Sequence, residues 1–294
     1  MDQLIAFFNS LRDRCLQWWW NSTSPSSQLP TPILRVEPVK LSLDSAHLQR
    51  TIEVYLYLPP TFTDSTNQTF PVLFFHDGQD FSRMDMTQRL EDAYQNKILS
   101  AHLVVGIVAG DRMQEYGTGK ILDYLERGSR SAAHNDFLIK ELLPFLITNH
   151  RASSGQFQHS VAGCSLGGLA ALYLAWTYPD YFRNVGIFSG SLWWRSHPFD
   201  EQYPDANLII HRLIDNSEKR PHLKLWFQAG TLDETSDRNH NGVIDAIDDT
   251  LFLIKILKNL GYTDEEIKYV EIQDGRHEPA TWAVAMPSFL EWIG

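Results

Sequence analysis

A Gly-x-Ser-x-Gly pentapeptide, set between a short apolar run and a small-residue helix pattern, constrains this chain more than any other feature. The segment reads Gln158-His159-Ser160-Val161-Ala162-Gly163-Cys164-Ser165-Leu166-Gly167-Gly168-Leu169-Ala170. This is the layout of a nucleophile elbow, in which a strand, a strained turn carrying the serine and a helix follow one another. Glycines are required at 163 and 167 because a side chain there would strike the neighbouring element, and Gly168 lets the helix pack closely. The amide of Leu166 would face the atom that Ser165 attacks. The alternative is an ordinary glycine-rich turn.

Short apolar runs alternate with helical patterns over most of the chain. Runs that are apolar throughout are typical of strands buried on both faces, and from residue 71 they fall at 72–75, 103–108, 160–162, 185–188, 223–227 and 269–272. Helical patterns fall at about 87–99, 133–148, 166–178, 207–216, 250–260 and 279–293. Two alternating runs at 35–43 and 51–58 predict an antiparallel pair at the sheet edge. We therefore expect a mostly parallel eight-stranded α/β sheet with helices on both faces, in a single domain over residues 33–294.

Residues 1–32 differ in character from this domain. Residues 1–20 predict an amphipathic helix ending in Trp18-Trp19-Trp20, and residues 21–32 form a linker rich in Ser, Thr and Pro. Charges interrupt the apolar patches and no cleavage site is clear, so neither a signal peptide nor a spanning helix is indicated, and a cytoplasmic location is expected. The helix would dock on the protein or lie on a membrane surface. Docking is favoured, because its polar face lacks a Lys/Arg cluster.

Composition excludes several classes of partner. The formal charge of −11 argues against nucleic acid and against an anionic membrane. The apolar content of 43% supports a large core. The two cysteines, Cys15 and Cys164, do not indicate a disulfide framework and leave the compartment open. No Gly-x-Gly-x-x-Gly follows a strand and no Walker loop is present, so no organic cofactor is expected.

A serine nucleophile needs a base, and that base needs a third group to hold it. In the α/β-hydrolase fold the chain order is Ser, then Asp or Glu after a later strand, then His after the last strand. The strand at 225–229 leads into Asp233, with Glu234 as the nearest alternative, and the last strand leads into His277. We therefore predict that His277 takes the proton of Ser165 and that Asp233 orients His277. Three other histidines lie in or beside strands and are predicted to be structural: His76, His102 and His159.

The loop after the first buried strand is the candidate source of a second oxyanion donor. It reads His76-Asp77-Gly78-Gln79-Asp80, and a glycine there allows backbone amides to approach a substrate oxygen. The amide of Gly78 or Gln79 would donate together with that of Leu166. Loss of one such donor costs about 10²–10³ in turnover. The alternative is a plain turn.

A second pattern, at residues 237–248, indicates a calcium loop. Oxygen ligands fall at positions 1, 3, 5, 7, 9 and 12 of a twelve-residue loop, the seventh through a carbonyl, with a glycine at the sixth. The six ligand positions are Asp237, Asn239, Asn241, Val243, Asp245 and Asp248. The loop resembles those of EF-hand and dockerin modules, but its last ligand is Asp rather than Glu and no helix precedes it. We expect a structural Ca²⁺ that holds the strand end bearing Asp233. The alternative is a polar surface loop.

A family resemblance covers the chain from about residue 35 to its end. It is carried by His76-Asp77-Gly78-Gln79, Asp111-Arg112-Met113-Gln114-Glu115-Tyr116-Gly117, Gly163-Cys164-Ser165-Leu166-Gly167-Gly168, Ser189-Gly190-Ser191-Leu192-Trp193-Trp194 and Gly275-Arg276-His277-Glu278-Pro279-Ala280-Thr281-Trp282. Together these motifs resemble the putative-esterase family of α/β-hydrolases, which includes enterochelin esterases, feruloyl and acetylxylan esterase domains and S-formylglutathione hydrolase. The resemblance implies the triad Ser165, His277 and Asp233. It also implies that five residues lie near the pocket mouth: Arg112, Glu115, Tyr116, Trp193 and Trp194. From the residues alone, Arg112 and Glu115 are equally explained by a helix-end ion pair, and the tryptophans by the core.

The expected function is a serine carboxylic-ester hydrolase that forms an acyl-enzyme and acts on a small-molecule or sugar-linked ester. Two alternatives remain open. The same triad would make an acyltransferase if an alcohol accepted the acyl group. A calcium-dependent binding protein on an inactive hydrolase scaffold would keep the fold without turnover. The sequence does not indicate the acyl group, the alcohol or the oligomeric state.

Overall fold

The sheet that carries the predicted site residues is built from alternating strands and helices. A computed structural model describes residues 35–64 and 66–294, so the predicted helix and linker at 1–32, with Cys15, lie outside the described residues. The described strands form one eight-stranded sheet in the order β1-β2-β4-β3-β5-β6-β7-β8. Only the β1–β2 and β2–β4 pairs are antiparallel, and they lie at one end of the sheet. The predicted mostly parallel sheet, with its antiparallel pair at the edge, is confirmed.

The strands are buried most deeply in the middle of the sheet, where the apolar runs lie. Their bounds are β1 Pro38–Ser45, β2 Arg50–Tyr57, β3 Val72–His76, β4 Leu103–Ile107, β5 His159–Cys164, β6 Phe182–Phe188, β7 Lys224–Leu232 and β8 Ile267–Arg276. Every residue of β3, β4 and β5 is buried. Such strands need apolar side chains on both faces, because helices cover both.

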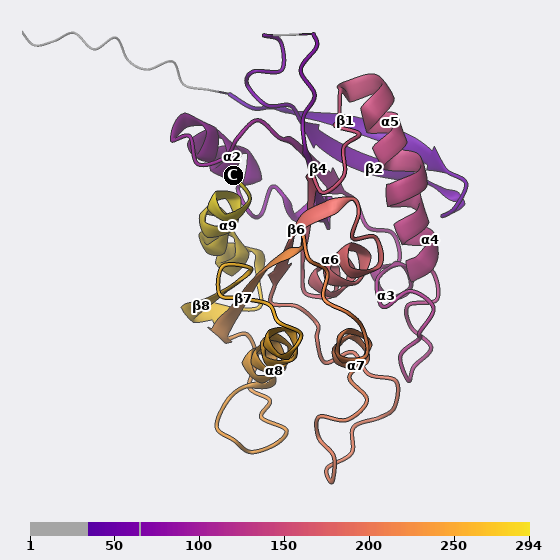
Figure 1. Cartoon of the computed structure of the whole chain (residues 1–294), viewed down its shortest axis with the longest axis vertical. Coiled ribbons are helices and arrows are strands. Elements are labelled where there is room, and N and C mark those ends of the chain that lie inside the picture. Colours follow the sequence, from indigo (N-terminus) through magenta and orange to yellow (C-terminus); the bar gives the residue numbers. More distant parts are fainter. Residues whose placement is uncertain (1–34, 65) are drawn as a thin grey trace, which may run out of the picture. The chain divides into compact units, whose positions relative to one another are not determined.

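Helices cover the two faces of the sheet unequally (Figure 1). Their bounds are α2 Met86–Gln95, α3 Arg112–Glu115, α4 Ser131–Asp136, α5 Leu143–His150, α6 Leu166–Thr177, α7 Ile209–Asp215, α8 Asp245–Asn259 and α9 Pro279–Ile293, with a 3₁₀ turn at Gly78–Asp80 and a π segment at Phe137–Leu142. Alternate residues of β3 face opposite layers. Leu73 and Phe75 pack with α2 and α9, whereas Val72 and Phe74 pack with the layer of α5, α6, α7 and α8.

The elements depart from the sequence-based bounds mainly at their polar ends. Strands β7 and β8 run four residues or more beyond the apolar runs at 223–227 and 269–272, because their last residues pair at the sheet rim, where burial is not required. Helix α8 begins at Asp245, earlier than expected, with Asp245 and Asp248 in a first turn that favours negative charge. Helix α3 is a single turn that no periodicity predicted.

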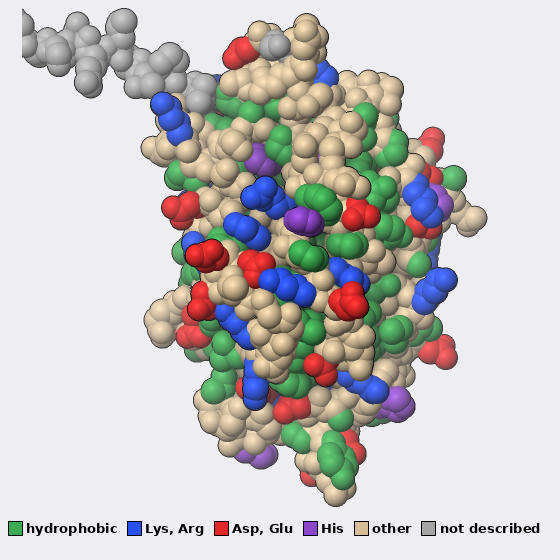
Figure 2. All heavy atoms as spheres, in the orientation of Figure 1, with side chains coloured by type: hydrophobic (Ala, Val, Ile, Leu, Met, Phe, Trp, Pro, Cys, Tyr) green, Lys and Arg blue, Asp and Glu red, His purple; other side chains and the backbone are tan. Residues whose placement is uncertain are grey.

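One face of the described part of the chain carries charges of both signs. On the face shown in Figure 2, basic side chains lie among acidic and apolar ones rather than forming a patch of a single sign. No helix among residues 35–64 and 66–294 is both long and apolar enough to cross a membrane.

Candidate active site

Ser165 stands in the strained turn between β5 and α6, as the elbow pattern predicted. Its φ of 57° and ψ of −122° are a conformation that non-glycine residues rarely adopt. The backbone around it holds this conformation. The Ser165 amide donates to the Phe188 carbonyl at 2.8 Å, and the Ser165 carbonyl accepts from the Ser191 amide at 3.0 Å. A Cβ added at Gly163 would lie 2.4 Å from the Gly167 carbonyl oxygen, so the turn closes only with glycine there.

The amides predicted to stabilise an oxyanion have no acceptor within the described part of the chain: those of Leu166, Gly78 and Gln79. Leu166 opens α6, and the first amides of a helix have no partner inside it. Gly78 follows Asp77, whose φ of 63° turns the chain back over β4. A Cβ added at Gly78 would lie 2.4 Å from the Gly106 carbonyl carbon, so the loop sits against β4 as only glycine allows.

Asp77 ties this loop to the elbow. Its carboxylate accepts two hydrogen bonds from Arg112, at 2.8 and 3.0 Å, and one each from the Tyr116 hydroxyl at 3.2 Å and the Gln79 amide side chain at 2.8 Å. A Cβ added at Gly167 would lie 2.9 Å from the Asp77 carboxylate, so the two loops are in contact. Asp77 therefore fixes the position of the loop whose amides were predicted to donate.

The suggested helix-end ion pair between Arg112 and Glu115 is not formed. Arg112 binds Asp77, and Glu115 binds Arg50, with nitrogen–oxygen distances of 2.8 and 2.7 Å. Glu115 is 1% exposed, and Tyr116 and Trp194 are fully buried, so these three do not face solvent at a pocket mouth. Arg112 and Trp193 do reach the surface. Glu115, Tyr116 and Trp194 instead belong to the buried interior that supports Arg112 and Trp193.

The register of the last two strands brings Asp233 and His277 side by side. Leu232 pairs with Arg276 at the end of β7 and β8, and the two candidate residues follow directly. Asp233 is buried; its Oδ2 accepts from the Gly230 amide at 3.0 Å, while its Oδ1 has no partner in the described part of the chain. A buried carboxylate oxygen without a donor is costly. His277 is the titratable neighbour that could supply one.

His277 lies at the surface, with its ring held at the edge of Trp282. The ring centroids are 5.5 Å apart at 85°, and the Trp282 indole donates to the Ser189 hydroxyl at 3.1 Å. Packing around the imidazole lowers the pKa of His277. The charge of Asp233 raises this pKa, and that of Arg112 lowers it further. The lowered pKa leaves the imidazole neutral at neutral pH, as a general base must be.

Neither hydrogen bond of the predicted triad is formed in this structure. Among the described residues, no hydrogen bond joins His277 to Ser165 or to Asp233, and the Ser165 hydroxyl instead lies 3.3 Å from that of Ser191. Catalytic hydrogen bonds are often long or poorly aligned before substrate binds. Glu234, the alternative acid, is half-buried, and Asp233 is the carboxylate whose charge acts on His277.

Sequence reasoning did not assign three residues that position the site: Asp77, Ser191 and Trp282. All three stand inside motifs quoted for the resemblance, but only their contacts reveal what they do. The histidines predicted to be structural are buried, and burial lowers the pKa of both His76 and His159 to about 4.

The loop at 237–248 folds back on itself around Asp237. Asp237 accepts from the amides of Asn241 and Gly242 at 3.1 and 2.9 Å, and the Asn239 side chain donates to Asp248 at 2.7 Å. Gly242 has φ +85°, so this position of the loop needs the glycine that the pattern supplies. Within the described residues, however, no three His, Cys, Asp or Glu side chains gather as a metal site. Asp245 is engaged by Arg238, whose amide donates to it at 2.9 Å.

Comparison with known proteins finds a matching family and similar solved structures. A family model described as "Putative esterase" matches residues 45–293. The uncharacterized protein YbbA of Bacillus subtilis (strain 168) is 27% identical over 245 residues, which cover 81% of this chain and 90% of that protein. A ferulic acid esterase structure has a TM-score of 0.66 at 16% identity, covering 88% of this chain and 98% of its own. The enterobactin esterase FES from Shigella flexneri, solved in the presence of enterobactin, has a TM-score of 0.69 at 20% identity, covering 92% of this chain and 60% of its own. At these identities the structural likenesses establish the fold.

Proposed function

Because the chain belongs to the esterase family of α/β-hydrolases and is a carboxylic-ester hydrolase, we propose that it acts through Ser165, His277 and Asp233 and forms an acyl-enzyme. The observation that carries the proposal is the pairing of β7 with β8, which sets a buried and unpartnered Asp233 oxygen beside His277. An imidazole N–H given to that oxygen would orient the ring and fix its tautomer.

The chemistry follows from these positions. His277 takes the Ser165 proton as the serine oxygen attacks the ester carbonyl, and the amides of Leu166 and of the Gly78–Gln79 turn hold the oxyanion. His277 then gives the proton to the departing alcohol, which leaves the acyl group on Ser165. Water, deprotonated by His277, attacks this acyl-enzyme and releases the acid. The strained φ of Ser165 supports the proposal because it lifts the hydroxyl clear of the sheet.

Hydrolysis of para-nitrophenyl acetate tests the proposal. Ser165→Ala is expected to lower kcat by about a millionfold, as loss of a triad nucleophile does. Ser191→Ala is the comparison variant: it removes the hydroxyl that lies 3.3 Å from that of Ser165 but keeps the amide that donates to the Ser165 carbonyl, so its loss of kcat should be far smaller. A rapid burst of nitrophenol in the wild type would report the acyl-enzyme. Equal rates for the wild type and Ser165→Ala would contradict the proposal, and an ester product with an added alcohol would indicate acyl transfer.

We further propose that the loop at 237–248 binds a structural calcium ion. Its donor set consists only of oxygens, which suits Ca²⁺. Hydrogen bonds already join Asn241 to Asp237, Asn241 to Asn239, and Asn239 to Asp248. The bound ion would brace the end of β7, since the loop begins only four residues after Asp233. Chelation should lower both the melting temperature and the activity, and added Ca²⁺ should restore them. A chelator that changes neither would exclude the ion.

A further inference from the structure

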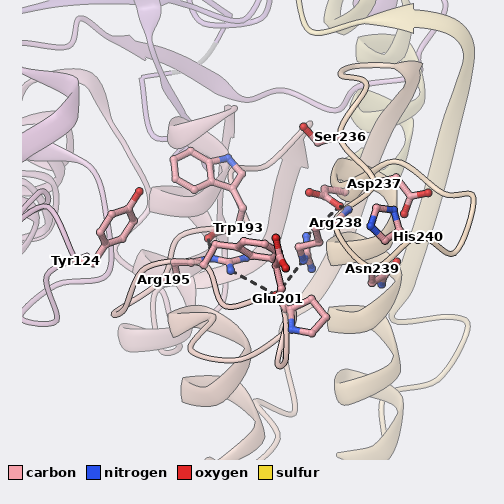
Figure 3. A pocket seen from close by; sticks show the side chains of 12 residues that line it. Tyr124, Trp193, Arg195, Glu201, Ser236, Asp237, Arg238, Asn239 and His240 are labelled. Carbon is pink, nitrogen blue, oxygen red and sulfur yellow. Dashed lines mark hydrogen bonds and ion pairs between the residues drawn. The ribbon is translucent and has the colours of Figure 1, made fainter.

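A pocket opens at the carboxyl edge of the sheet, lined by loops that follow β6 and β7. Its volume is about 710 Å³, within the range of small-molecule pockets, and it lies between the loop after β6 and the loop after β7. In Figure 3, Tyr124 stands on one side, the loop at 237–240 on the other, and Trp193, Arg195 and Glu201 between them. Trp193 follows Ser191 by two residues, a span of at most about 7 Å. The pocket wall is therefore close in the chain to Ser191, whose hydroxyl lies 3.3 Å from that of Ser165.

Arg195 is the unusual member of this lining. It is 7% exposed, yet it forms no ion pair with any described carboxylate. Its Nε donates to the Trp193 carbonyl at 3.2 Å and its Nη1 to the Pro204 carbonyl at 3.4 Å. Its Nη2 has no acceptor among the described residues, and Arg195 borders the pocket. A guanidinium is rarely buried without a carboxylate or phosphate bound to its donors.

The neighbouring arginine takes the carboxylates that Arg195 lacks. Arg238 forms ion pairs with Asp205, Asp245 and Asp249 and also donates to the Pro204 carbonyl at 3.1 Å. These carboxylates pair with Arg238 rather than with Arg195, whose Nη2 is left without an acceptor among the described residues. Asp237, at the pocket wall, has its oxygens occupied by the amides of its own loop.

Backbone hydrogen bonds and ring contacts fix the residues that line the pocket. The Arg195 carbonyl accepts from the Tyr124 amide at 3.1 Å, and the Arg195 backbone bridges to Leu208. Behind the pocket, Arg127 lies over the rings of Trp193 and Trp194, at 5.5 and 4.6 Å, and is itself paired with the buried Asp123. A ligand would therefore meet a wall that is already ordered, which lowers the entropy cost of binding.

We propose that this pocket binds a flat, carboxylate-bearing portion of the ester substrate, with Arg195 donating to the carboxylate and Trp193 covering the flat face. The inference rests on the proposed function of Ser165, since it names the substrate class of the same site. A carboxylate matches the planar fork of a guanidinium, whereas an ammonium group would be repelled by it. Glu201 opposes this contact, because its negative charge would repel a carboxylate. Its side chain is exposed at the rim and has no partner among the described residues.

Matched pairs of esters test the proposal on the wild-type enzyme. One arm compares para-acetoxybenzoate with its methyl ester, so that the alcohol portion carries the charge. The other compares mono-para-nitrophenyl glutarate with its methyl ester, so that the acyl portion carries it. We expect kcat/KM to favour the charged member by about tenfold to a hundredfold in one arm, as for a hydrogen bond to a charged group. Arg195→Met should bring the ratio of the two kcat/KM values close to one. Arg195→Lys should retain part of the preference for the charged ester, and Glu201→Gln should increase it.

Binding to the Ser165→Ala protein separates this inference from the proposed catalysis. Calorimetry should show benzoate binding about tenfold or more tightly than benzamide, with the difference lost in the Ser165→Ala, Arg195→Met double variant. Selective binding without ester hydrolysis by the wild type would contradict the catalytic proposal and leave the pocket supported. Hydrolysis that depends on Ser165, with equal rates in both arms and equal binding of the two ligands, would overturn the pocket inference alone.

Discussion

The turn after β5 and the ends of β7 and β8 hold their reactive groups in different ways. Backbone hydrogen bonds and glycine contacts fix Ser165 in a conformation with φ 57°. His277, by contrast, is at the surface, and its ring is held by an aromatic contact with Trp282 rather than by a hydrogen bond. The proposed nucleophile is therefore held by the backbone, whereas the proposed base depends on side-chain packing and on a carboxylate with one oxygen unpartnered among the described residues.

This difference predicts where the protein is sensitive to substitution. Changes at the elbow act on the backbone, so they should affect folding and activity together. Changes at the β7–β8 ends act on single side chains and leave the backbone pairing of the two strands in place, so they should reduce activity more than stability.

Among side chains at the ends of β7 and β8, the largest effect is expected at Asp233. Asp233→Asn would leave the size of the side chain unchanged but give His277 the wrong tautomer, and kcat should fall by about 10⁴. Thermal unfolding should change little, because the Gly230 amide can still donate to the remaining oxygen. Glu234→Gln is the control and should stay within a few-fold of the wild type. If both variants lost activity equally, the assignment of the acid to Asp233 would be wrong.

Alanine substitutions at two glycines distinguish a steric clash with the backbone from the strain of a positive φ alone. Gly163→Ala places a methyl 2.4 Å from a backbone oxygen that cannot move away, so we expect about a hundredfold loss of kcat/KM and a loss of about 1–3 kcal/mol in unfolding free energy. Gly242→Ala meets nothing within 4 Å and has only its positive φ to accommodate, which costs about 1 kcal/mol. Steady-state kinetics and chemical denaturation of both variants measure the contrast. Equal destabilisation would show that the elbow is looser than its contacts indicate.

The elbow was predictable from sequence because its chemistry is local. A serine at positive φ between a short apolar strand and a small-residue helix requires glycines at fixed spacing, and these glycines are visible in the sequence. The places of Asp233 and His277 were predictable for another reason: parallel strands end at the same edge of a sheet, so the order of strands along the chain already brings the residues after them together.

The supporting contacts were not predictable, because they join residues that no local pattern relates. Asp77 and Arg112 are 35 positions apart, and Arg50 and Glu115 are 65 apart. Only the folded structure therefore shows that Arg112 pairs with Asp77 and Glu115 with Arg50. Arg195 is a similar case. Arginine is usually a surface residue, and nothing in the run Trp193-Trp194-Arg195 indicates that its guanidinium is buried.

A smaller effect is expected at Trp282, whose ring contacts the proposed base His277. Trp282→Leu removes both the edge contact with His277 and the hydrogen bond to Ser189, and kcat should fall by up to about tenfold, the value of an aromatic pair. Trp282→Phe keeps a ring at the edge of His277 and should lose less. KM should be unchanged in both, because neither variant alters the pocket. A change in KM alone would assign Trp282 to binding.

The smallest effect should appear only in acid, where His277 becomes protonated. Activity requires the neutral imidazole, so kcat/KM falls as pH falls through the pKa of His277, and this pKa lies below the ordinary value of 6.5. The charge of Arg112 disfavours the imidazolium and that of Asp233 favours it. Arg112→Met should therefore move the acid limb to higher pH, and Asp233→Asn should move its residual activity to lower pH. Because Arg112 also binds Asp77, the position of the limb is the readout, rather than the rate, and an NMR titration of the His277 ring checks it independently. Shifts in the same direction for both variants would contradict the placement of His277 between the two charges.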